Sequence, residues 1–79
     1  PLGKAEEFLR KLGFGQVRVR HHGQIARVEI APNEFAKAVK PDMRAKIVGS
    51  LKKIGYLYVT LDLAGYRTGS LNEALRLKR

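Results

Sequence analysis

Residues 17–23 read VRVRHHG and place a basic side chain at every second position. Successive side chains of a β-strand point to opposite faces, so in a strand the two valines face a core while Arg18, Arg20 and His22 share the other face. Guanidinium groups bind phosphate and carboxylate through paired hydrogen bonds. The pattern therefore predicts an anion-binding row, with His22 as a titratable donor beside the two arginines.

Cross-strand ion pairing is the alternative use for these charges. Glu29 and Asp62 belong to two further expected strands, where they would pair with arginines and keep an exposed sheet soluble. We favour anion binding, because the alternating arginines and histidine exceed what a few acids neutralise. No metal site is expected, since His21 and His22 point to opposite faces of a strand and the chain has no cysteine.

The overall charge also favours anionic partners. Among 79 residues, 16 Lys and Arg stand against 7 Asp and Glu, a net charge of +9, which suits nucleic acid, nucleotides or phosphorylated small molecules. A solvated basic surface is the alternative. We expect no membrane partner, because no stretch approaches the roughly 20 apolar residues of a membrane span. The lack of cysteine fits a reducing compartment, and we expect a cytoplasmic protein.

Apolar periodicity and turn residues divide the chain into helices and strands. Glycines at 13, 23 and 55 follow three of these elements, and Pro41 opens the longest helix. The expected elements are a helix over 5–12, strands over 17–22 and 26–30, helices over 32–39 and 41–54, and a strand over 57–63.

The order helix, strand, strand, helix, strand predicts a small two-layer α+β sandwich. Helices would cover one face of a three-stranded, mainly antiparallel sheet, as in a ferredoxin-like fold that lacks its first strand. The bare face would then show Arg27, Tyr58 and Thr60 beside the basic row. Small domains of this class often use such a face for binding or assembly, which is an argument from analogy.

Residues 65–70 read GYRTGS and form a second candidate site. Their glycines, hydroxyls and arginine suit a loop that wraps a phosphate with backbone amides. The simpler interpretation, a connection in which Tyr66 packs on the core, is favoured on local sequence. No complete catalytic centre emerges from the sequence, so we expect this chain to bind or assemble.

The segments 5–9, 18–23, 25–30 and 65–73 together resemble the C-terminal domain of the LarE-type PP-loop family, which comprises ATP-dependent sacrificial sulfur transferases. The resemblance implies that residues 1–79 are a C-terminal accessory domain from a longer enzyme whose N-terminal ATP-pyrophosphatase domain is separate. The full-length protein would use ATP and Mg²⁺ to adenylate a carboxylate and then transfer sulfur. This domain alone would not be catalytic.

The same resemblance assigns roles to individual residues. It implies that Arg18 and Arg20 hold the phosphate of a pyridinium mononucleotide, with Glu6 or the adjacent Glu7 nearby. Further candidate supporting residues are Arg27, Tyr66, Arg67 and Ser70. The implied protein partners are the domain's own N-terminal PP-loop domain and further copies in a homo-oligomer. A stand-alone nucleic-acid-binding module is the alternative, although the expected sheet face offers only Tyr58 for base stacking.

Overall fold

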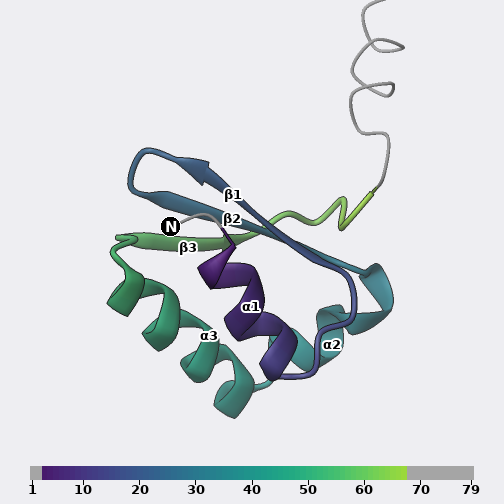
Figure 1. Cartoon of the computed structure of the whole chain (residues 1–79). Coiled ribbons are helices and arrows are strands. Elements are labelled where there is room, and N and C mark those ends of the chain that lie inside the picture. Colours follow the sequence, from purple (N-terminus) through teal and green to yellow (C-terminus); the bar gives the residue numbers. More distant parts are fainter. Residues whose placement is uncertain (1–2, 68–79) are drawn as a thin grey trace, which may run out of the picture.

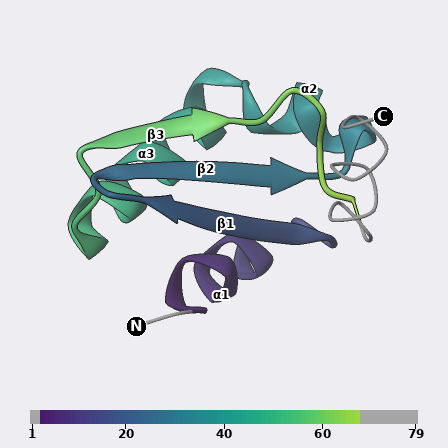
Figure 2. The ribbon, with the colours of Figure 1, turned by 90° about the horizontal axis from the view of Figure 1, so that it is seen from above.

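The computed structural model describes residues 3–67 of the chain, which form helices and a small sheet (Figure 1). The elements are α1 (Lys4–Lys11), β1 (Val17–His22), β2 (Ile25–Ile30), η1 (Pro32–Glu34), α2 (Phe35–Ala38), α3 (Pro41–Ile54) and β3 (Tyr58–Leu61). The sheet forms one layer, and the helices lie on one side of it, α1 next to β1 and α3 next to β3 (Figures 1 and 2). The expected small two-layer α+β fold is confirmed.

The sheet has the strand order β1-β2-β3 and is mixed. β1 and β2 form the expected antiparallel hairpin, which turns at Gly23 with a φ of 58°. β3, in contrast, pairs parallel to β2. The expected antiparallel pairing is therefore found in the hairpin and not between β2 and β3. The reason is the connection: the chain runs through η1, α2 and α3 before it returns, and such a helical crossover brings a strand back in parallel.

The two long helices end in the same way. The amide of Phe14 donates to the carbonyl of Leu9 at 3.2 Å, and the amide of Tyr56 donates to the carbonyl of Leu51 at 3.2 Å. In each case the residue between helix and aromatic is a glycine with positive φ, which is the geometry of a Schellman cap. Phe14 enters the core, whereas Tyr56 lies half-buried at the opposite end of the helix layer.

The core lies between the sheet and the helices. Its buried residues are Ala5, Leu9, Phe14, Val17, Ala26, Val28, Ile30, Ala38, Ile47 and Leu51. The apolar stripes expected for the helices and the first two strands are thereby confirmed.

The third strand is shorter than expected. Leu63 is 77% exposed, because the chain turns immediately after β3. The Asp62 side chain accepts a hydrogen bond from the amide of Ala64 at 2.9 Å, and its carbonyl accepts one from the amide of Gly65 at 3.0 Å. This turn ends the strand before the alternation reaches Leu63. None of the helices within residues 3–67 has the length and apolarity needed to cross a membrane.

Candidate anion-binding site

The basic row lies on the sheet face that the helices leave bare. Val17 is buried and Val19 half-buried, whereas Arg18 and His22 are exposed and Arg20 is half-buried. The expected alternation along β1 is thus confirmed. Whether the row binds an anion remains a prediction.

Glu29 lies near the end of the central strand β2 and is only 6% exposed. Its Oε2 atom lies 3.4 Å from Nε of Arg20 and 3.3 Å from Nη2 of Arg27. A buried carboxylate is costly unless cations and hydrogen bonds compensate it, and the two arginines supply both. Cross-strand charge pairing, the alternative in the sequence interpretation, therefore accounts for part of the basic face.

Arg27 is held between two carboxylates. Besides its contact with Glu29, its Nε lies 3.6 Å from Oδ2 of Asp62 in the turn that follows β3. That separation is an ion pair but too long for a hydrogen bond. Arg27 thus serves the charge balance within the sheet, and Arg18 and Arg20 remain the candidates for binding an external anion.

The segment that follows β3 passes the end of β2 toward the start of β1 (Figure 2), and Tyr66 belongs to this segment. The guanidinium carbon of Arg18 lies 6.0 Å from the centre of the Tyr66 ring, within the range of a cation–π contact. The backbone amide of Tyr66 donates to the carbonyl of Ile30 at 2.7 Å, which fixes the main chain of Tyr66 at the end of β2. The structure thereby brings the predicted supporting residue Tyr66 to Arg18.

The amides of Gly65 and Tyr66, in the described part of the 65–70 segment, donate to backbone carbonyls within the chain. The amide of Gly65 donates to Asp62 and the amide of Tyr66 donates to Ile30. Arg67 is exposed at the end of the described residues, and Ser70 lies outside them. In residues 65–67 the segment therefore acts as the connection that positions Tyr66.

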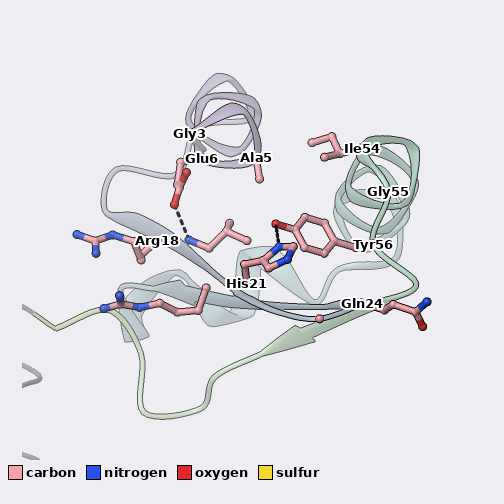
Figure 3. A pocket seen from close by; sticks show the side chains of 12 residues that line it. Gly3, Ala5, Glu6, Arg18, His21, Gln24, Ile54, Gly55 and Tyr56 are labelled. Atoms are coloured by element: carbon pink, nitrogen blue, oxygen red, sulfur yellow. Dashed lines mark hydrogen bonds between the residues drawn. The ribbon is translucent and has the colours of Figure 1, made fainter. Parts of the chain in front are cut away.

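Glu6 rather than Glu7 approaches the first strand. Its Oε2 atom accepts a hydrogen bond from the amide of Val19 at 2.8 Å (Figure 3). This amide belongs to the residue between Arg18 and Arg20. It points away from β2, toward the open edge of β1, and so donates to Glu6 rather than to the neighbouring strand. Glu7 is exposed on α1. The contact therefore favours Glu6 over Glu7 as the glutamate beside the arginine row, and its role there stays a prediction.

A cleft of about 750 Å³ opens beside this edge, between the start of α1, β1 and the end of α3 (Figure 3). His21 and Tyr56 form one wall, with Nδ1 of His21 and the Tyr56 hydroxyl 3.1 Å apart and hydrogen-bonded. Glu6 lies toward the other wall, and Arg18 extends away from Tyr56. Sequence reasoning placed His22 in the site and missed the cleft, because nothing local to the strand indicates that Tyr56 meets His21.

The residues described by the structure contain no group of three His, Asp or Glu side chains placed to hold a metal ion. His22 stands at the hairpin end of the row, opposite Ile25. The geometry of residues 3–67 thus offers guanidinium groups, a tyrosine ring beside one of them and a buried carboxylate in contact with two of them. Guanidinium groups are suited to an anionic ligand.

Fold and site together define a small two-layer α+β domain whose bare sheet face carries an arginine–carboxylate network. No family model matches the chain. It is 43% identical over 74 residues to the uncharacterized protein slr1717 of Synechocystis sp.. It is 41% identical over 71 residues to the pyridinium-3,5-bisthiocarboxylic acid mononucleotide synthase of Lactiplantibacillus plantarum.

These matches cover 94% and 90% of this chain but only 28% and 25% of the two relatives. The chain therefore spans about a quarter of the length of the curated relatives it matches. The second match, at 41% identity, supports a relationship with the LarE-type sulfur transferases.

Proposed function

We propose that this chain is the substrate-phosphate-binding and oligomerisation domain of a PP-loop ATP-dependent sulfur transferase. The observation that carries the proposal is the pair Arg18 and Arg20 on the edge strand, with Glu6 bound to the amide between them. The 41% identity to a mononucleotide synthase supports it, because a mononucleotide carries one phosphate. The alternative is a stand-alone nucleic-acid-binding module.

The two arginines suit a single phosphate group. Residues two apart in a strand lie about 7 Å apart along it and project to the same side. The carboxylate of Glu29 contacts Nε of Arg20. This contact does not use the two Nη groups of Arg20, which can together donate to a phosphate. Arg18 lies over the ring of Tyr66. A phosphate dianion between the two guanidinium groups would accept charge-assisted hydrogen bonds from both.

The proposed reaction belongs to the full-length protein. With ATP and Mg²⁺ handled by a separate ATP-pyrophosphatase domain, the substrate carboxylate attacks the α-phosphorus of ATP and releases pyrophosphate. The thiolate of a sulfur donor then attacks the carbonyl carbon of the acyl adenylate and releases AMP. In this scheme the present domain holds the mononucleotide through its phosphate. We place the protein in the cytoplasm, where ATP is available.

An NMR titration of the 79-residue chain with nicotinic acid mononucleotide tests the binding role, with inorganic phosphate as a second ligand. We expect saturable shifts at Arg18, Arg20 and Tyr66. The double variant Arg18→Ala/Arg20→Ala should weaken binding by at least about tenfold, the equivalent of one charge-assisted hydrogen bond.

A matched control removes the same charge elsewhere. Lys52 and Lys53 are exposed near the end of α3, so Lys52→Ala/Lys53→Ala lowers the net charge equally without touching the sheet face. Equal weakening by both double variants would show generic electrostatics and overturn the phosphate site.

Tyr58 is the residue through which the nucleic-acid alternative can be tested. It is 57% exposed on the same face as the arginines, where an aromatic ring can stack on a base. A short RNA added to the wild-type chain should produce only weak binding that falls steeply with salt. Tight RNA binding that depends on Tyr58 and persists with salt would favour the alternative.

The assembly part of the proposal concerns β3, whose outer edge is unpaired within residues 3–67. Leu57 and Leu63 flank this strand and are exposed, and an open edge with apolar flanks favours pairing with another chain. Sedimentation of the wild type should show an oligomer that Leu63→Lys weakens. A wild type that is monomeric at millimolar concentration would remove the assembly role.

A further inference from the structure

We propose that Glu29 is a positioning residue that orients the guanidinium group of Arg20 for phosphate. The inference rests on the proposed function, and it adds a residue to which the sequence interpretation gave only a charge-pairing role. Its basis is the contact of one buried carboxylate oxygen with two arginines.

Glu29 is much more buried than the two arginines that it contacts, Arg20 and Arg27. The Glu29 side chain is 7% exposed, whereas those of Arg20 and Arg27 are 35% and 41% exposed. The carboxylate is thus the fixed member, enclosed within the sheet face, and the arginines reach it from the solvent side. Because an uncompensated buried charge is strongly unfavourable, the carboxylate holds at least one guanidinium group against it.

The strand register explains why this anchor is needed. Arg20 and Arg27 are direct cross-strand partners, and like charges at such positions repel each other. Oε2 of Glu29 lies within 3.4 Å of both arginines and offsets that repulsion. Without the carboxylate, Arg20 would turn away from Arg27 into solvent.

The contact also selects how Arg20 presents its donors. Arginine can bind oxyanions through Nε with one Nη, or through its two Nη groups end-on. Glu29 engages Nε, which directs the end-on fork away from the sheet. Ordering a free arginine side chain on binding lowers affinity by roughly two- to tenfold, and an anchored side chain avoids that loss.

The sign of the effect separates positioning from simple electrostatics. Glu29→Gln removes a negative charge next to the proposed anion site, so Coulomb attraction alone predicts tighter phosphate binding. Loss of orientation predicts weaker binding. We expect inorganic phosphate to bind the Glu29→Gln chain about two- to tenfold more weakly than the wild type. We also expect the Arg20 Nε–H NMR signal to shift toward that of a free arginine.

Two further variants complete the test. Glu29→Asp keeps the charge but shortens the reach to Arg20, so it should also weaken phosphate binding; urea unfolding of both variants confirms that they are folded. Asp42→Asn makes the same charge change at an exposed position of α3 and should leave affinity within about twofold.

The outcomes separate the two proposals. Phosphate binding in Glu29→Gln as tight as or tighter than in the wild type, with Arg18→Ala/Arg20→Ala still abolishing it, would overturn the positioning role alone. A wild-type chain whose phosphate affinity does not depend on the two arginines would overturn both.

Discussion

Replacement of Gly65 by alanine tests how the segment after β3 positions Tyr66. Gly65 has a φ of +85°, and a Cβ atom there would lie 2.9 Å from Cγ of Pro32 and 3.0 Å from the carbonyl oxygen of Ile30. The left-handed backbone costs an alanine about 1–2 kcal/mol, and overpacking against a ring and a carbonyl adds about 1–3 kcal/mol. We therefore expect Gly65→Ala to lower the free energy of unfolding by about 2–5 kcal/mol.

Gly23→Ala is the matched control. Gly23 also has a positive φ, of 58°, but no atom lies within 4 Å of the Cβ it would gain. Its substitution should therefore cost only about 1–2 kcal/mol. Urea unfolding at 25 °C, followed by circular dichroism, measures both variants. In thermal unfolding the additional loss should lower the midpoint by about 4–8 °C per kcal/mol.

Gly65→Ala should also affect phosphate binding, because Gly65 and Tyr66 both lie against Ile30. Its carbonyl accepts the amide of Tyr66, so displacement at Gly65 moves the ring that lies under Arg18. Phosphate affinity should fall in Gly65→Ala and stay near the wild-type value in Gly23→Ala. If Gly65→Ala is no less stable than Gly23→Ala, the close approach to Pro32 does not constrain the segment and the reasoning fails.

Three further changes test the packing and the cleft. Leu9 is fully buried, so Leu9→Ala should destabilise the chain by about 2–5 kcal/mol in urea unfolding; a loss below 1 kcal/mol would contradict the core described above. Glu6→Ala leaves the Val19 amide without its charged acceptor and should cost about 1–3 kcal/mol, with Glu6→Gln costing less. Hydrogen exchange at Val19 should quicken in the alanine variant, and unchanged exchange would argue against the bond. Tyr56→Phe removes an exposed hydrogen bond with His21 and should cost no more than about 1 kcal/mol, while shifting the His21 ring signals in NMR; unperturbed ring signals would refute the pairing.

Much of the fold could be predicted because its signals act over a few residues. Apolar spacing located α1 and α3, Gly13 and Gly55 marked their ends, and the alternation along 17–22 assigned the faces of β1. The length of β3 could not be predicted, since the continued alternation through Leu63 is overridden by the turn that the Asp62 side chain forms. The parallel pairing of β3 likewise depends on how the crossover helices pack.

The candidate site divides in the same way. The row of Arg18 and Arg20 follows from the sequence alone, because side-chain direction in a strand has a period of two. That Glu29 holds Arg20 and Arg27 together, that Tyr66 lies beside Arg18, and that Glu6 reaches Val19 were decided by the tertiary structure. Each of these contacts joins segments from different elements, and their meeting depends on strand register and chain return. The sequence by itself determined which side chains share the sheet face, whereas packing decided which of them neutralise one another and which remain candidates for binding an anion.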